Sequence, residues 1–303
     1  MSDLHASMLT GESLHDSSTA EEVSLRPDFT VRFWGVRGSV PTPGAENVRY
    51  GGNTACVEVL IDEQRLIFDG GTGLRALGKH LLHAEAQIHA HIFFTHVHWD
   101  RIQGFPFFIP AFAAGNRFDI YGAPAPNGAS IKQSLMEQML RPNFFTPLQK
   151  MAAEMTFHNI SAGTLIQLPN GATVEAIALN PTTSALGFRI SHAGRSLVYA
   201  TDTDDLTEGT NKNLLYLVQG ADLVIYDGTY SDTAYHDLNG SANIPWERSI
   251  EIAKQAQIEE LILFHHNPAH DDDYLEQMES EIHKQFSNIH LAREGMVMQL
   301  VRV

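Results

Sequence analysis

The sequence predicts an α/β protein in which two β-sheets pack face to face and helices cover their outer faces. Three observations lead to this fold class. The 303 residues are enough for a large core, and 43% of them are hydrophobic while 18% are charged. Strand patterns occur in two groups along the chain, and each group has interspersed helix patterns. A sheet covered by helices on one face buries its other face against a second sheet, which favours this layered arrangement.

The first group of elements occupies the N-terminal half. It begins at 29–36, where FTVRFWGV alternates and is rich in β-forming residues. Glycine, proline and asparagine separate the later patterns, as is typical of turns. The predicted elements are strands at 29–36, 56–61, 65–68 and 92–94, and helices at 74–83 and 130–140.

The second group continues towards the C-terminus. Short apolar runs bounded by turn residues are typical of buried strands, whereas apolar residues three and four positions apart indicate helices. The predicted elements are strands at 155–159, 164–168, 172–179, 186–191, 196–200, 222–226, 260–264 and 296–301, and helices at 246–257 and 273–286.

Composition narrows the possible partners and location. Residues 1–28 are acidic, with no apolar segment of signal-peptide type, so we expect a disordered tail before one domain at 29–303. A formal charge of −16 argues against general nucleic-acid binding or membrane binding, but it permits a small anionic substrate. The single cysteine, Cys56, excludes an intramolecular disulfide and favours a reducing, cytoplasmic setting. The apolar stretch 105–112 has three open interpretations: a pocket wall, a homodimer interface, or core.

A motif with metal-ligand spacing directly follows the apolar run 92–94. It reads Thr95-His96-Val97-His98-Trp99-Asp100-Arg101. Two imidazoles and a carboxylate at alternating positions can converge on one divalent cation, and a strand end holds them rigidly. Arg101 is the exception, because its permanent positive charge repels a metal ion.

Other predicted strands also end on residues of ligand type. Asp202 follows the strand at 196–200, and His265 and His266 follow the strand at 260–264. Asn180 ends a further strand on an amide. Asp69 follows the strand at 65–68, where its carboxylate can hold a ligand histidine in one tautomer.

Taken together, these segments resemble the metallo-β-lactamase fold superfamily, in particular its phosphodiesterase-like hydrolases. The resemblance implies a four-layer αββα sandwich of two mixed sheets flanked by helices, with the site at the sheet edges. It runs from about Phe29 to the C-terminus and is carried by Phe33–Ser39, Gly51–Thr54, Asp69–Gly73, the 95–101 motif, Thr201-Asp202 and Phe264–Pro268.

The resemblance also implies a ligand set for two metal ions. His96 and His98 match ligands of the first metal, Asp100 matches a ligand of the second, and Asp202 matches the carboxylate that bridges both. His265 matches the last ligand, with His266 as the alternative.

Three positions depart from this family pattern. Arg101 stands in place of a second-metal histidine, Asn180 in place of the third first-metal histidine, and Asn243 near a histidine thought to aid proton transfer. His96, His98 and Asp202 still provide the three protein ligands that a catalytic zinc site needs. We expect Arg101 to pair with Asp100, Asp202 or both, and to exclude a second ion.

Two functions follow from this degenerate site. In the first, one divalent metal supports hydrolysis of a phosphodiester such as a cyclic nucleotide, with zinc favoured over manganese or iron. Asp100 or Asp202 then orients the water, Arg101 stabilises the oxyanion, and His266 or His236 protonates the leaving group. In the second, the protein binds no metal and is an inactive pseudo-hydrolase that senses a ligand or binds another protein.

Overall fold

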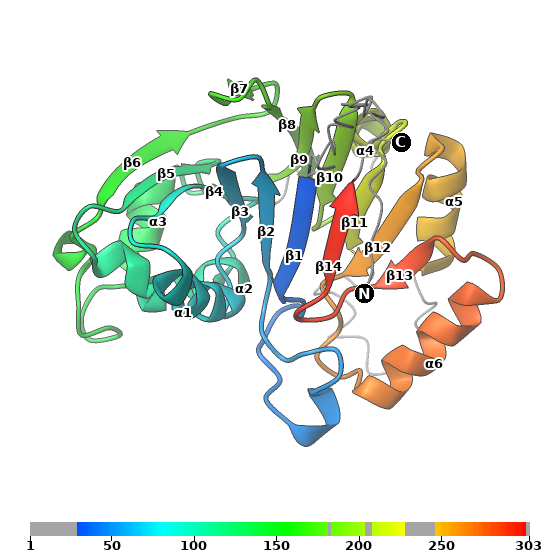
Figure 1. The fold of residues 1–303 in the computed structure, drawn as a ribbon, viewed down its shortest axis with the longest axis horizontal. Helices are drawn as coiled ribbons and strands as arrows, with labels where there is room; N and C mark the ends of the chain where they lie inside the picture. Colours follow the sequence, from blue (N-terminus) through cyan, green and yellow to red (C-terminus); the bar gives the residue numbers. More distant parts are fainter. Residues whose placement is uncertain (1–28, 181–182, 204–207, 228–245, 301–303) are drawn as a thin grey trace, which may run out of the picture.

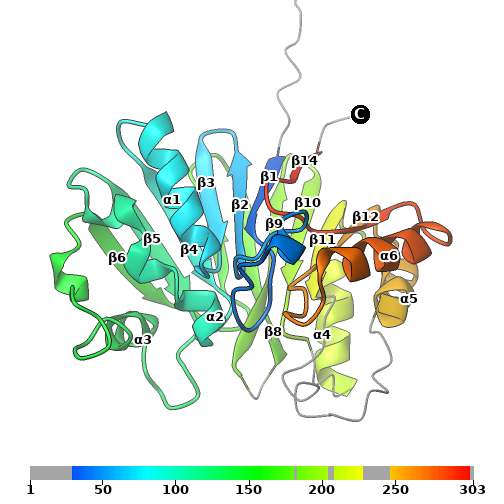
Figure 2. The same ribbon diagram turned by 90° about the horizontal axis from the view of Figure 1, so that it is seen from below.

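Two seven-stranded sheets packed face to face form the protein, with helices on both outer faces (Figure 1). The computed structural model describes residues 29–180, 183–203, 208–227 and 246–300. Figure 2 shows the same layers from below, with α1 to α3 on one side of the two sheets and α4 to α6 on the other. The predicted sandwich is therefore confirmed, whereas the predicted tail at 1–28 lies outside the described residues.

The first sheet has the strand order β14-β1-β2-β3-β4-β5-β6. Strands β3 to β6 run parallel, and the other neighbours pair antiparallel. The strands are β1 (Phe29–Gly35), β2 (Cys56–Ile61), β3 (Gln64–Phe68), β4 (His89–Phe94), β5 (Arg117–Gly122), β6 (Glu154–Asn159) and β14 (Val297–Leu300). The helices over its outer face are α1 (Gly73–Ala84), α2 (Trp99–Ile102) and α3 (Ile131–Glu137).

The second sheet has the strand order β13-β12-β11-β10-β9-β8-β7, with β10 to β13 parallel. The strands are β7 (Leu165–Gln167), β8 (Thr173–Asn180), β9 (Ala185–His192), β10 (Arg195–Ala200), β11 (Leu223–Asp227), β12 (Glu260–Phe264) and β13 (Ile289–Leu291). The helices over its outer face are α4 (Glu208–Val218), α5 (Trp246–Ala256) and α6 (Asp272–His283).

Aromatic side chains fill the space between the two sheets. Phe68 lies 5.3 Å from Phe93, 5.6 Å from Phe188 and 5.4 Å from Tyr199, measured between ring centroids. Burial of one such ring contributes about 1.5–3 kcal/mol. Tyr199 has its ring in this core, while its hydroxyl reaches Asp69 at the edge of the first sheet. The core thus fixes the base of the candidate site.

The apolar stretch 105–112 packs mainly into the outer core of the first sheet. It forms two short 3-10 helices, Phe105–Phe107 and Ile109–Phe112; the other two are Ala45–Asn47 and Leu148–Lys150. Phe105 and Phe108 are buried there, whereas Phe107 and Ile109 are about half exposed. A homodimer interface at this stretch stays a prediction. Within the described ranges, no helix is both long and apolar enough to cross a membrane.

Candidate active site

The candidate site lies where parallel strands of both sheets end. Asp69 follows β3 and His96 follows β4, while Asp202 and His265 follow β10 and β12 of the second sheet. Asp69, Asp202 and His265 adopt left-handed backbone conformations, with φ of 60°, 63° and 63°. Such conformations are uncommon outside glycine and cost on the order of 1 kcal/mol or more each. Strain at three strand ends around one point is typical of a functional site.

A hydrogen-bonded chain from Asp69 orients the imidazole of His96. The amide and hydroxyl of Thr95 both lie 2.9 Å from Asp69 Oδ1, and Thr95 Oγ1 lies 3.0 Å from His96 Nδ1. With the hydroxyl proton donated to Asp69, Thr95 Oγ1 accepts the Nδ1 proton, and Nε2 keeps its lone pair. Burial and the nearby Arg101 charge lower the pKa of His96. Asp69 therefore reaches the histidine through Thr95, and the ring is neutral.

Arg101 is almost completely buried among carboxylates, with 1% of its surface exposed. Its Nη1 lies 3.0 Å from Asp69 Oδ2 and 3.4 Å from the Tyr199 hydroxyl, and its Nε lies 3.4 Å from Asp100 Oδ2. Burial disfavours the guanidinium charge, but Asp69, Tyr199 and Asp100 raise its pKa above the ordinary value. The expected pairing with Asp100 is present, whereas the second partner is Asp69 instead of Asp202.

His265 lies between two carboxylates. Its Nε2 is 3.0 Å from Asp100 Oδ2, and its Nδ1 is 3.3 Å from Asp227 Oδ2. Gly38 packs against the ring so closely that a Cβ atom there would lie 2.9 Å from it. Burial and Arg101 lower the pKa of His265, but Asp227 and Asp100 outweigh them and raise it to about 9. At neutral pH the ring is therefore a second buried cation.

This histidine should make stability depend on pH in metal-free protein. Because the folded-state pKa of about 9 exceeds the ordinary value of 6.5, protonation stabilises the fold below pH 6.5 and this effect is lost as the pH rises through 9. We expect the free energy of unfolding to fall by on the order of 1–3 kcal/mol across that window, measured by urea titration. His265→Gln should flatten the decline; an equally steep decline in that variant would contradict the assignment.

Asp227 belongs to the site although the sequence analysis did not identify it. It is the last residue of β11, and its Oδ2 accepts the backbone N–H of Asp202 at 2.9 Å in addition to contacting His265. The pattern that indicated Asp202, an acidic residue at the end of an apolar strand, is also present here, because apolar residues 223–226 precede this carboxylate. The predicted strand at 222–226 ended one residue too early.

Asp202, His98 and Asn180 complete the predicted set. Asp202 Oδ2 lies 3.9 Å from His96 Nε2 and accepts the Thr183 hydroxyl. His98 is exposed, and its ring centroid lies 4.4 Å from that of His96. Asn180 Oδ1 accepts the backbone N–H of Thr183 at 3.3 Å, so this amide oxygen supports the loop after β8.

His266 has its contacts away from this cluster. Its Nε2 lies 2.7 Å from the carbonyl oxygen of Ala292, and Tyr50 contacts its ring edge-on at 5.9 Å. Burial lowers the pKa of His266 to about 3. The structure therefore brings His265 to the site and leaves His266 in the packing behind it. His236 and Asn243 lie outside the described residues.

His96 and Asp202 are donor types that suit a divalent metal ion. His96 Nε2 and Asp202 Oδ2 lie 3.9 Å apart, and the exposed ring of His98 lies beside that of His96. These three residues are the number of protein ligands that a catalytic zinc site uses. Arg101 occupies the region beside Asp100 where a second ion would lie, and its charge would repel that ion.

Comparison with known families agrees with this fold. The model of a family described as "Beta-lactamase superfamily domain" matches residues 64–266, more than half of the chain. The chain belongs to this β-lactamase superfamily. Its structure has the metallo-β-lactamase fold that the sequence resemblance implied, and its relatives in the superfamily include hydrolases.

Individual proteins resemble the chain over most of their length, in sequence or in fold. A ribonuclease Z from Picrophilus torridus is 24% identical over 310 residues, which covers 88% of this chain and 94% of the relative. A diphosphatase of the PhnP family superposes with a TM-score of 0.62 at 17% identity, covering 90% of this chain and 97% of that structure. Zinc-bound PqqB from Methylobacterium extorquens gives 0.63 at 14% identity, covering 89% and 100%.

Proposed function

We propose that this superfamily member is a hydrolase of small phosphodiesters that uses at most one divalent metal ion, with zinc as the favoured ion. One observation carries the proposal: His96 Nε2 and Asp202 Oδ2 face each other at 3.9 Å, while the buried Arg101 lies beside Asp100 where a second ion would bind. Manganese and iron are the alternative ions for such a donor set.

The ligands would be His96, His98 and Asp202. When bound, the metal supplies a water molecule whose pKa is lowered towards neutrality. Thr95 and Asp69 keep His96 in the tautomer whose Nε2 can donate its lone pair. Asp202 is held by Thr183 and by the backbone contact to Asp227, so its carboxylate needs little rearrangement to bind or to orient the water.

Arg101 and His265 would replace the charge of the missing second ion. Both are cations inside the carboxylate cluster, and both contact Asp100. The guanidinium is too deeply buried to contact substrate directly, so we assign it an electrostatic role in place of direct oxyanion binding. Asp100 is likewise a positioning residue that holds these two cations together.

The net charge of the protein and the names of its relatives both indicate a substrate class. A formal charge of −16 disfavours long nucleic acids, whose phosphates the protein would repel. The relatives named ribonuclease Z and diphosphatase point to cleavage at phosphorus–oxygen bonds. A cyclic nucleotide or a similar small phosphodiester satisfies both constraints.

His96→Ala tests this proposal. We expect the variant to bind one zinc fewer per chain than the wild type, and to lose hydrolysis of bis(p-nitrophenyl) phosphate and of cyclic nucleotides. His89→Ala changes an exposed histidine at the start of β4 and should leave both properties unchanged. Equal zinc content and equal hydrolysis in wild type and His96→Ala would refute the proposal.

A pseudo-hydrolase without metal is the second candidate. One observation favours it: among the residues that the structure describes, no three ligand atoms of this cluster lie within 4.8 Å of one another. Calorimetry separates the two functions. Cyclic-nucleotide binding that persists without zinc and without turnover would favour this candidate.

A further inference from the structure

A second cluster of ligand-type residues lies far from the strand ends of the candidate site. Helix α6 packs along β13, the edge strand of the second sheet (Figure 1). Glu279 and His283 are four positions apart on α6 and therefore share one face of the helix. His290 comes from β13. Each of these residues offers one ligand atom, and the three atoms all lie within 4.8 Å of one another.

The geometry is close to that of a bound ion. The rings of His283 and His290 lie 5.2 Å apart between centroids and are nearly perpendicular, with an interplanar angle of 75°. Tetrahedral zinc with bonds of about 2.0–2.1 Å holds its ligand atoms about 3.3–3.4 Å apart. Because His283 is exposed at the last turn of α6, a change in its side-chain torsions can close this gap.

Neighbouring groups hold Glu279 in place and lie close to His290. Glu279 Oε1 accepts the Leu291 N–H at 3.0 Å, and Oε2 accepts the Tyr50 hydroxyl at 2.8 Å and Arg293 Nη2 at 2.6 Å. Oε1 has one such partner among the described residues, which leaves it a lone pair that can bind a cation. Glu260 Oε2 lies 3.4 Å from His290 Nε2, and a carboxylate beside a ligand histidine orients the ring.

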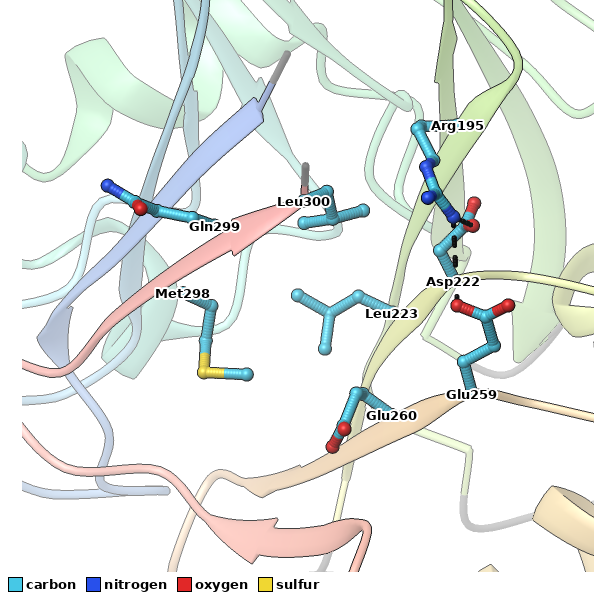
Figure 3. Close-up of a pocket in the computed structure, with 8 residues that line it drawn as sticks. All are labelled: Arg195, Asp222, Leu223, Glu259, Glu260, Met298, Gln299 and Leu300. Carbon is cyan, nitrogen blue, oxygen red and sulfur yellow. Dashed lines mark hydrogen bonds and ion pairs between the residues drawn. The ribbon is translucent and has the colours of Figure 1, made fainter. Parts of the chain in front are cut away.

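The surroundings are acidic. Glu260 also lines a cavity of about 270 Å³, bounded by β14 on one side and by β10 to β12 on the other (Figure 3). Asp222 and Glu259 line the same cavity, and Arg195 is the cation that pairs with both. Arg293 also contacts Glu279, but its side chain is 42% exposed, so solvent screens its repulsion of an ion more than it screens that of the buried Arg101. The acidic groups outnumber Arg195 and Arg293 here, and the excess negative charge attracts a cation to this end of the second sheet.

We propose that Glu279, His283 and His290 bind one transition-metal ion, which clamps α6 to β13. Two imidazoles and one carboxylate select zinc, nickel or copper over magnesium and calcium, and water completes the coordination. The role is structural. The N-terminal end of α6 holds the loop before β2, since Asp272 accepts the backbone N–H groups of Arg49 and Tyr50. That loop also contains Gly38, against which His265 packs.

Metal binding to tag-free protein tests the clamp. After chelator treatment, the protein is titrated with zinc and cobalt, and zinc per chain, cobalt absorption and the zinc-dependent rise in Tm are measured. We expect His283→Ala to bind one zinc fewer and to show a smaller zinc-dependent rise in Tm, with affinity at this site reduced at least about 100-fold. His83→Ala is the matched control, because His83 is also an exposed histidine in the last turn of a 12-residue helix.

Two further variants make the result decisive. His290→Gln should reproduce the loss seen in His283→Ala, which shows that the loss does not come from disturbance of the helix. His96→Ala should keep the part of the zinc-dependent rise in Tm that His283→Ala loses. These variants therefore test the metal clamp independently of the proposed hydrolase. An unchanged zinc content and an unchanged rise in Tm in both His283→Ala and His290→Gln would overturn it.

Discussion

Replacement of Arg101 by methionine should lower the free energy of unfolding by about 3–5 kcal/mol. Methionine fills a similar volume, but it leaves the buried carboxylates of Asp69 and Asp100 without their shared cation. An unpaired charge in a fully buried position loses its hydration without a compensating partner. Urea titration with intrinsic fluorescence as the signal measures the change.

Two comparisons isolate the buried charge as the cause. Arg49→Met removes an arginine that also pairs with acidic residues but is 45% exposed, so it should cost much less stability than Arg101→Met. Asp69→Asn combined with Arg101→Met should recover part of the loss, because both members of one pair are then neutral. An equal effect of Arg49→Met and Arg101→Met would contradict a special role for this pair.

Arg101→His together with Asn180→His should convert the site into a two-metal centre. The first change removes the guanidinium beside Asp100 and supplies a second-position imidazole, and the second supplies the missing ligand of the first position. We expect zinc at this centre to rise from at most one to two per chain, measured by elemental analysis in a His283→Ala background. Binding replaces the lost cation, so zinc at 100 times its Kd should restore about 2.7 kcal/mol of stability.

Dependence of stability on chelator provides the critical control. A chelator should lower the urea concentration at which the double variant unfolds. The wild type keeps Arg101 as its internal cation, so a chelator should lower its unfolding midpoint less. Arg49→His adds a histidine at an exposed position and should bind no additional zinc there. Unchanged zinc content in the double variant would show that these two positions are not equivalent to ligand positions.

Local sequence patterns predicted the strands that support the site. Strands β3, β10 and β12 lie within one residue of their expected positions, because apolar runs bounded by turn residues leave little ambiguity. Helix α4 was not predicted, since Glu208–Val218 contains glycine and asparagine and has weak intrinsic helix propensity. Its packing against the second sheet through Leu214 and Leu217 supplies the missing stability. Strand β13 has three residues, too few for a periodic pattern.

The site depends on contacts that no local pattern contains. His265 and His266 are adjacent, and only the left-handed backbone at His265 shows which ring reaches Asp100. The pairing of Arg101 with Asp69 joins residues 32 positions apart and requires β3 and β4 to be neighbours. The sequence could indicate which carboxylates belong to the site, but it could not determine which of them pair with the guanidinium of Arg101.

The three left-handed residues at the strand ends constrain how this protein can be stabilised. Glycine at Asp69, Asp202 or His265 would relax the backbone by on the order of 1 kcal/mol, but at Asp69 or His265 it would also leave a buried charged partner uncompensated and so cost more than it gains. Each such replacement deletes one member of the charge cluster. A mutant library designed to raise thermal stability should therefore leave all three residues unchanged. Backbone strain favours glycine at these positions, whereas the charge cluster requires their side chains.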